Sequence, residues 1–215
     1  VGHDALRYNT AADNTAVGSG ALDANTTGTA NVAVGKGALS ANTTASNNTA
    51  VGHNSLSTQT TGSENTAVGK SALQYNTGSN NTSVGHDSML DNTSGGYNTA
   101  LGKSALANNT TASNNTAVGY AALLTNTTGH SCTAIGVEAL EAHTTGQRNT
   151  AIGFKSQEAT TSSRYNTSVG SYSLYTNTTG EWNTSVGDAS LAQNTTGSNN
   201  CAFGQQALYV NSTAN

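Results

Sequence analysis

Asn14-Thr15-Ala16-Val17-Gly18 is the stretch that decides the fold, because the chain repeats it from end to end. It recurs unchanged as Asn48–Gly52, Asn65–Gly69 and Asn115–Gly119, and with small substitutions between these copies. A fixed short period of this kind is typical of repeat architectures. The closing glycine is spaced by 17 residues, or by 16 in two intervals, and falls at positions 2, 18, 35, 52, 69, 85, 102, 119, 136, 153, 170, 187 and 204.

The composition favours an ordered repeat over a disordered chain. Disordered chains are usually rich in charge and proline, whereas here 8% of the 215 residues are charged, there is no proline, and the apolar residues are periodic. The formal net charge of −4 leaves no basic stripe, so we expect no nucleic-acid partner. No apolar run approaches the length of a membrane span and no basic-then-apolar leader opens the chain, so we expect no membrane association.

Two apolar columns accompany the glycine. The residue before it is Val, Ile, Leu or Phe in every copy, and the residue four positions after it is Leu except at Met89 and Gln157. Asn, Thr, Ser and Gly are poor helix formers, and short β-branched runs between Gly and Asn indicate strands and turns.

The sequence therefore predicts an all-β solenoid or β-roll of about 12–13 stacked coils in a single domain, residues 1–215, with two short strands and two turns in each coil. The predicted core residues are Val17, Leu22, Val34, Leu39, Val51, Leu56, Val68, Leu73, Val118, Leu123, Ile135 and Leu140.

Polar columns support the same stacking. Asn lies four residues before the glycine and Thr eight residues after it, and identical amides stacked in register form hydrogen-bonded ladders. The recurring glycine, which is never replaced, must have either a positive φ or a close backbone neighbour. A second, looser glycine is replaced by Ala45, Ala112 and Ser163, so a positive φ is not required there. The predicted ladder residues are Asn14, Asn31, Asn48, Asn65, Asn81, Asn98, Asn115, Asn149, Asn166, Asn183 and Asn200.

The small residues predict self-association. Alternation along Asn-Thr-Ala-Val-Gly places Ala and Gly on the face opposite Val, and a strip of small residues suits a close interface between identical chains. We therefore expect a homotrimer, with a monomeric solenoid as the alternative. Cys132 and Cys201 lie four repeats apart, roughly 19 Å at one strand spacing per coil, which is too far for an internal disulfide bond. A contact between chains stays open, and inert packing is the favoured interpretation.

The repeat resembles two families of fibrous proteins. Asn31-Val32-Ala33-Val34-Gly35 and Thr133-Ala134-Ile135-Gly136 resemble the repeat of trimeric autotransporter adhesin heads, which are left-handed β-roll trimers that bind surfaces. The units Asn-Thr-Ala-Val-Gly-x-x-Ala-Leu and Asn-Thr-Thr-Gly more closely resemble repeats of bacteriophage tail-fibre proteins. The resemblance covers essentially the whole chain. It implies a structural or adhesive segment of a longer fibre, located outside the cell, on a virion or on a cell surface.

The sequence shows no catalytic constellation, and we expect no enzyme activity, no cofactor and no metal site. His3, His53 and His86 share one column, directly after the glycine, with lysine and serine, which indicates a solvated turn. The adjacent pairs His3-Asp4 and His86-Asp87 are expected to diverge, as neighbours on a strand do.

Many asparagines match the glycosylation pattern Asn-x-Ser/Thr, for example Asn25, Asn126 and Asn177. Such matches arise by chance in a chain this rich in Asn and Thr, and a glycan on every coil is the weaker alternative.

Aromatic residues in variable columns are the candidates for recognition. Tyr97, Tyr165 and Trp182 share the column just before the recurring Asn, and Phe154 and Tyr172 lie in the turn after the glycine. Exposed aromatic rings on a polar scaffold can stack on sugars. We therefore predict a surface for cell-surface glycans, strongest between residues 154 and 182, against the plainer interpretation that these are scattered turn residues.

Two other functions compete with the fibre. Threonine ladders on a β-face are typical of ice-binding solenoids, but the best threonine column, which includes Thr110, Thr127 and Thr144, lies in a turn-like Asn-Thr-Thr-Gly segment. A double ladder separated by one residue is not evident. Bulky residues at these three positions should abolish ice binding by that column. The second alternative is end-to-end polymerisation into a filament, because both termini are repeats without polar caps.

Overall fold

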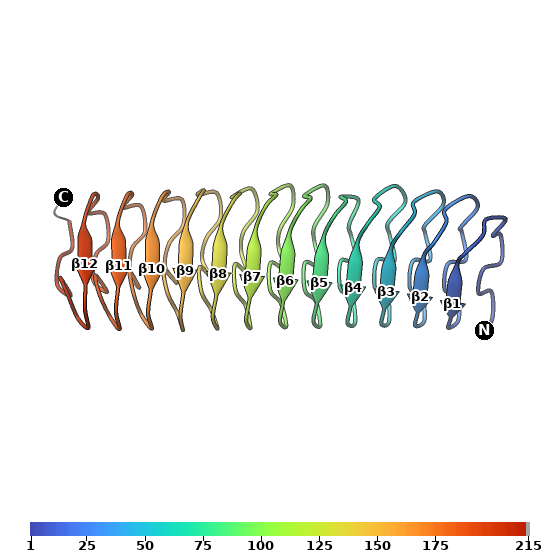
Figure 1. Cartoon of the computed structure of the whole chain (residues 1–215), viewed down its shortest axis with the longest axis horizontal. Coiled ribbons are helices and arrows are strands. Elements are labelled where there is room, and N and C mark those ends of the chain that lie inside the picture. Colours follow the sequence, from blue (N-terminus) through green and yellow to red (C-terminus); the bar gives the residue numbers. More distant parts are fainter. Residues whose placement is uncertain (214–215) are drawn as a thin grey trace. The chain divides into compact units, whose positions relative to one another are not determined.

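The computed structural model describes residues 1–213, which form twelve three-residue strands and no helix. Contacts divide the chain into two compact units, Val1–Thr111 and Ala112–Asn215. The strands are labelled in Figure 1. The first unit contains β1 (Thr15–Val17), β2 (Val32–Val34), β3 (Thr49–Val51), β4 (Thr66–Val68), β5 (Thr82–Val84) and β6 (Thr99–Leu101). The second contains β7 (Thr116–Val118), β8 (Thr133–Ile135), β9 (Thr150–Ile152), β10 (Thr167–Val169), β11 (Thr184–Val186) and β12 (Cys201–Phe203).

Each unit is a parallel β-solenoid. Consecutive strands within a unit pair in parallel and in register, offset by one repeat, so that Ala16 pairs with Ala33 and Thr167 with Thr184. Successive strands are separated by repeats of about 17 residues, so the twelve strands bound about 11 complete coils in the two units together, fewer than the 12–13 predicted. The prediction of an all-β solenoid is confirmed, but each coil holds one strand and not two.

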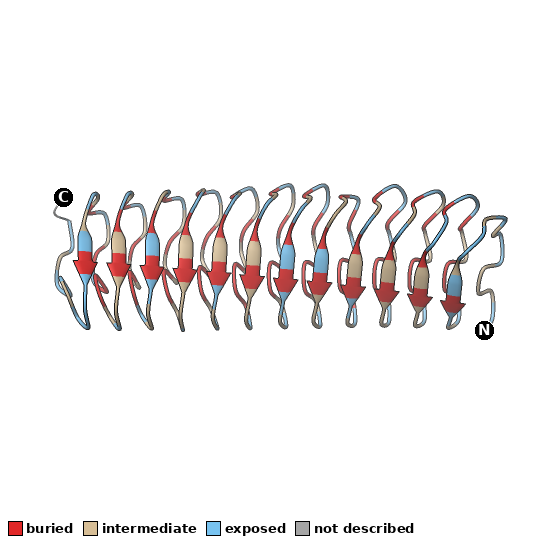
Figure 2. Ribbon diagram, in the orientation of Figure 1, coloured by how far each residue is buried: buried red, intermediate tan, exposed pale blue. Residues whose placement is uncertain are grey.

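The coil interior is built from leucine and alanine. The middle residue of every strand, Ala or Ser, is buried, and the residues on either side of it are partly or fully exposed (Figure 2). From the opposite side of the coil, the leucine four residues after the glycine fills the centre. The predicted core residues Leu22, Leu39, Leu56, Leu73, Leu123 and Leu140 are all completely buried.

The valine half of the predicted core is wrong. Val17, Val68 and Ile135 are 43%, 36% and 38% exposed, and Val34, Val51 and Val118 are partly exposed. Side chains alternate between the two faces of a strand, so burying alanine turns its valine neighbour outward. The strip of small residues predicted to form a trimer interface therefore lies inside the coil.

The recurring glycine meets both conditions expected of it. Gly52 has a φ of 140°, and a Cβ built on it would lie 2.3 Å from the carbonyl oxygen of Gly69 in the next coil. Any side chain would thus clash with backbone. The second glycine differs as predicted, because Gly28 has no positive φ.

Left-handed residues other than glycine turn each coil. They occupy three columns: the second residue after the glycine, the leucine, and the residue before the recurring Asn, as at Lys155 (φ 52°), Leu140 (φ 52°) and Tyr165 (φ 58°). A positive φ is uncommon outside glycine and is costly for a bulky residue. The stacked coils hold this conformation throughout the repeat.

The predicted asparagine column forms a ladder between side chain and backbone. Asn31 donates its backbone N–H to Asn14 Oδ1 (2.9 Å) and its Nδ2 to the Ala45 carbonyl (2.9 Å). The same pair of bonds recurs at Asn48, with Asn31 and Gly62 as the acceptors. Each amide thus links neighbouring coils and satisfies the turn that carries the second glycine.

A second buried asparagine column, not predicted, forms the amide-to-amide ladder. These residues lie seven positions after the glycine, and Asn42 Nδ2 donates to Asn25 Oδ1 at 2.8 Å while Asn92 Nδ2 donates to Asn76 Oδ1 at 2.6 Å. The Asn of each Asn-Thr-Thr-Gly unit was the sequence signal for it. Its fully buried asparagines are Asn25, Asn42, Asn76, Asn92, Asn109, Asn126, Asn177 and Asn194.

This second ladder removes three glycosylation candidates. Asn25, Asn126 and Asn177 are completely buried, and each donates its Nδ2 to a backbone carbonyl three residues further on. An oligosaccharide cannot be attached to a side chain that the folded coil encloses.

Candidate functional site

The regular interior of the second unit is interrupted between residues 132 and 168. Gln157 replaces the core leucine and is fully buried; its Nε2 donates to the Thr150 carbonyl (2.9 Å) and to Ser168 Oγ (2.8 Å). Its Oε1 has no hydrogen-bond partner among the described residues. Cys132 and His143 also replace residues of the repeat in this stretch.

His143 is a member of the buried amide ladder. Its Nδ1 lies 3.1 Å from Asn126 Oδ1 and its Nε2 lies 3.2 Å from Asn149 Nδ2. Because the amide oxygen can only accept, Nδ1 carries the proton and Nε2 accepts from Asn149. Burial lowers the pKa of His143 to about 4, so the ring is neutral at pH 7.

Cys132 and His143 lie together, but their environment opposes nucleophilic catalysis. Cys132 Sγ is 3.9 Å from His143 Nε2, and burial raises the pKa of the Cys132 thiol to about 11. A reactive cysteine needs a lowered thiol pKa and access to substrate. Cys132 is buried, so only Cys201, which is exposed, is available for a contact between chains.

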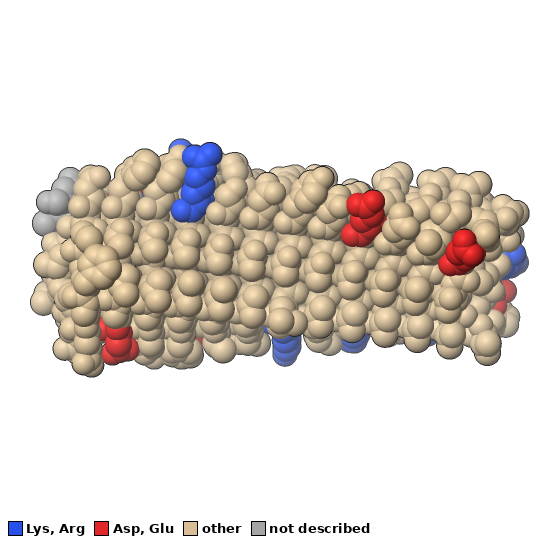
Figure 3. All heavy atoms as spheres, in the orientation of Figure 1, with Lys and Arg blue, Asp and Glu red and all other residues tan. Residues whose placement is uncertain are grey.

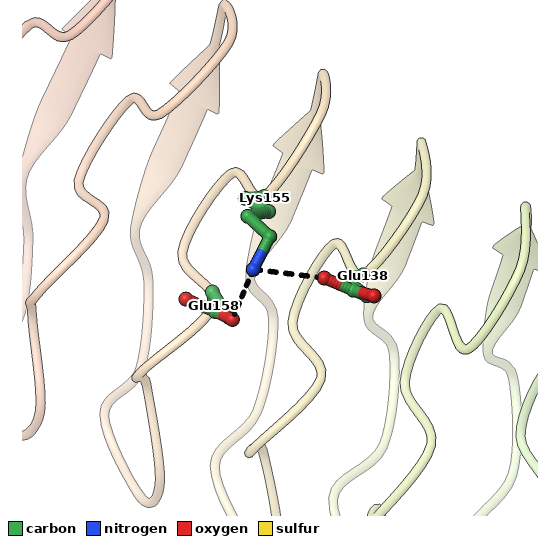
Figure 4. A network of polar contacts seen from close by, with 3 residues as sticks. All are labelled: Glu138, Lys155 and Glu158. Atoms are coloured by element: carbon green, nitrogen blue, oxygen red, sulfur yellow. Dashed lines mark hydrogen bonds and ion pairs between the residues drawn. The ribbon is translucent and has the colours of Figure 1, made fainter.

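A charged cluster lies on the surface of the second unit (Figure 4). Lys155 Nζ is 2.9 Å from Glu138 Oε2 and 2.9 Å from Glu158 Oε1. Carboxylate oxygens of Glu138, Glu141 and Glu158 all lie within 4.8 Å of one another. Desolvation, followed by repulsion from Glu138 and Glu158, raises the pKa of Glu141. The lysine already supplies a positive charge to these carboxylates, so the arrangement is an ion-pair network.

Four of the five predicted aromatic residues come together in two pairs. Tyr165 and Trp182, from adjacent coils, stack with ring centroids 4.0 Å apart and planes 10° apart. Arg148, one coil earlier in the same column, donates Nη1 to the Tyr165 hydroxyl at 2.7 Å. Arg148, Tyr165 and Trp182 are called the aromatic ladder below.

The second pair extends to a residue that the sequence analysis missed. Phe154 and Tyr172 meet edge to face with centroids 5.3 Å apart, and Tyr172 meets Tyr175 in the same way at 5.3 Å. A hydrogen bond to Glu158 raises the pKa of the Tyr175 hydroxyl and joins these rings to the charged cluster. The other aromatic residue in its column, Tyr209, is two coils further on, so no run of neighbouring aromatic residues marked Tyr175.

Tyr97 belongs to neither pair. It belongs to the first unit and is 67% exposed. It shares its column with Tyr165 and Trp182 in the sequence, but the nearest members of that column, Asn80 and Asn114, are not aromatic. Within residues 1–213, the contacts between aromatic rings are therefore all in the second unit.

The histidine–aspartate pairs differ from the prediction. His3 Nδ1 lies 2.8 Å from Asp4 Oδ2, and His86 Nδ1 lies 3.0 Å from Asp87 Oδ2. The two aspartates have positive φ in a turn, with values of 57° and 55°, which brings neighbouring side chains together where a strand would separate them. Exposed pairs of this kind contribute little to stability.

Residues 1–213 form no pocket for a small molecule, and they contain no helix that could cross a membrane. The candidate surfaces are thus open faces of the coils. No family model, curated protein or solved structure matches the chain.

Proposed function

We propose that the chain is a structural and adhesive segment of an extracellular fibre and binds surface glycans through the aromatic ladder of its second unit. The observation that carries this proposal is the stacked pair of Tyr165 and Trp182, with centroids 4.0 Å apart, held on the outside of a self-stacking solenoid. The interior of the coil is filled by side chains, which leaves recognition to the outward, variable columns.

The chemistry of the aromatic ladder suits a sugar. Trp182 is 55% exposed, and the C–H face of a pyranose ring packs against an aromatic face. The stack with Tyr165 fixes the orientation of the indole, and Arg148 in turn anchors Tyr165. A ring held in place before binding loses less conformational entropy when the ligand arrives.

Binding to immobilised cellulose, chitin and alginate tests the proposal. Trp182→Ala should weaken retention on whichever polysaccharide binds the native chain by roughly tenfold or more, as expected for a central aromatic anchor. Tyr97→Ala is the matched control, because it removes an aromatic residue that is even more exposed, at 67%, from the same column. This variant should bind as the native chain does.

The proposal fails if the native chain binds none of these polysaccharides, or if both variants lose binding to the same extent. A thermal melt of each variant, followed by circular dichroism, shows whether any loss reflects unfolding. The location on a virion or cell surface is part of the same proposal. Immunogold labelling of intact particles or cells tests it.

A further inference from the structure

The outward face of the strands carries two regular columns that no part of the proposed function uses. The first residue of each strand is Thr except at Val32 and Cys201, and the third is Val, Ile, Leu or Phe. None of the residues in the strands is charged. On the face that Figure 3 shows, charged side chains are few and stand apart from one another.

The most regular part lies in the second unit. Over β7–β11 the first column is threonine without interruption and the second is valine or isoleucine. The five rows are called the Thr/Val face below. It consists of Thr116, Val118, Thr133, Ile135, Thr150, Ile152, Thr167, Val169, Thr184 and Val186.

The hydroxyls of the Thr/Val face are available to water. Among the described residues, the threonines in the strands donate their Oγ1 to no protein group. The threonines eight residues after the recurring glycine differ: Thr144 Oγ1 donates to the Thr161 carbonyl (3.0 Å) and Thr178 Oγ1 to the Thr195 carbonyl (3.0 Å). The turn column uses its hydroxyls to join coils, whereas the strand column presents them to solvent.

Strand geometry fixes the spacing of these groups. In-register parallel strands lie about 4.8 Å apart, and two residues along a strand rise about 6.6 Å. The face is thus a two-column grid of hydroxyl and methyl groups, with periods close to the oxygen repeats along the a and c axes of hexagonal ice. Methyl groups restrict the arrangement of nearby water, and the hydroxyls between them hold that water by hydrogen bonds.

We propose that the Thr/Val face binds the surface of ice crystals. A second threonine ladder is absent from these strands, as predicted, and Val or Ile forms the second column of the face. Sequence analysis had placed the candidate ladder at Thr110, Thr127 and Thr144, in the turn. The hydroxyl bonds of that column join coils, which moves the site to the strands.

The dimensions of the face favour ice over a second protein. Five rows at strand spacing and two residues of width cover roughly 200 Å², whereas a stable protein interface buries about 800 Å² on each partner. The absence of charged residues in the strands also leaves no electrostatic complementarity for a protein partner. A protein surface that binds ice requires neither a concave site nor charged groups. It requires groups whose regular spacing matches that of the lattice.

Thermal hysteresis of the 215-residue chain is the test. We expect the native chain to separate its freezing and melting points, and we expect the double variant Thr133→Tyr/Thr150→Tyr to lose this separation because two rings break the grid. Thr128→Tyr/Thr145→Tyr is the matched control: it places the same substitutions at exposed positions in the turns, and it should retain the hysteresis.

Three results would overturn the proposal. They are a native chain without hysteresis, equal loss in both double variants when circular dichroism shows both folded, and a native oligomer that only the strand variant dissociates. The last result would make the face a protein interface. Trp182→Ala, which tests glycan binding, should leave the hysteresis unchanged, so the two proposals can fail separately.

Discussion

At the scale of single residues, His143 makes the stability of the second unit depend on pH. Burial lowers its pKa to about 4 from an ordinary value of 6.5. The unfolded state therefore takes up a proton at a higher pH than the folded state. The neutral ring therefore contributes its full share to the free energy of unfolding above pH 6.5. As the pH falls from 6.5 to 4, the free energy of unfolding decreases by about 3 kcal/mol.

Urea unfolding followed by circular dichroism at pH 7 and pH 5 measures this effect. His143→Asn restores the residue that the column carries elsewhere, and Asn194, with its bond to Asn177 Oδ1, shows the geometry expected of it. This variant should lose much less stability between the two pH values than the native chain. If both chains lose the same stability, the pH dependence does not come from His143.

Residue patterns predicted one side of the core and misassigned the other. The leucine column could be identified because a large apolar side chain recurs once in every period. The sequence left open which of two neighbouring strand residues, Ala or Val, faces the interior, and the greater hydrophobicity of valine favoured the wrong one. The interior of the coil has no room for a valine at this position. Leu22 already fills the centre, so only Ala16 or a residue of similar size fits opposite Leu22. The recurrence of Ala or Ser on both sides of the coil was the signal that could have decided this.

At the scale of the coil, the second residue after the glycine is a strained corner that glycine would relax. Ala189 has a φ of 51° there, and Gly20 occupies the same position in another coil with a φ of 65°. Ala189→Gly removes a left-handed penalty of about 1–2 kcal/mol but adds freedom to the unfolded chain, so we expect a net stabilisation of about 0.5–1 kcal/mol.

The control is Ala192→Gly in the same coil. Ala192 is buried and is not left-handed, so the same substitution should destabilise the chain by about 1 kcal/mol. The midpoints of urea unfolding compare the two variants. Destabilisation by Ala189→Gly would show that this corner is not strained.

The coil also explains why two strands were predicted where one forms. On the leucine side, backbone groups do bond from coil to coil, as Leu22 N–H does to the Ala38 carbonyl (3.0 Å) and Thr26 N–H to the Thr43 carbonyl (2.9 Å). The positive φ of the leucine prevents an extended conformation there. Periodicity predicted the stacking but could not reveal a left-handed residue in a column without glycine.

At the scale of the whole molecule, the candidate surfaces follow from which side chains the coil leaves outside. The aromatic residues could be named from the sequence, because they stand out in polar columns. Their grouping required the structure: Tyr165 and Trp182 stack because they occupy one column in adjacent coils, whereas Tyr97 has no such neighbour. The Thr/Val face was not predicted, since it depends on burying Ala16 and its equivalents.

The solution mass of the chain distinguishes an ice-binding strand face from one that joins identical chains. The strip of small residues expected to join three chains lies inside the coil, and the exposed strand columns are narrow for a protein interface. We therefore expect light scattering to give the mass of one chain, 21.5 kDa. A mass of three chains would instead require an interface on an outward face. If Thr133→Tyr/Thr150→Tyr then returned the mass to one chain, the Thr/Val face would be that interface, and the homotrimer predicted from the repeat would replace ice as its partner.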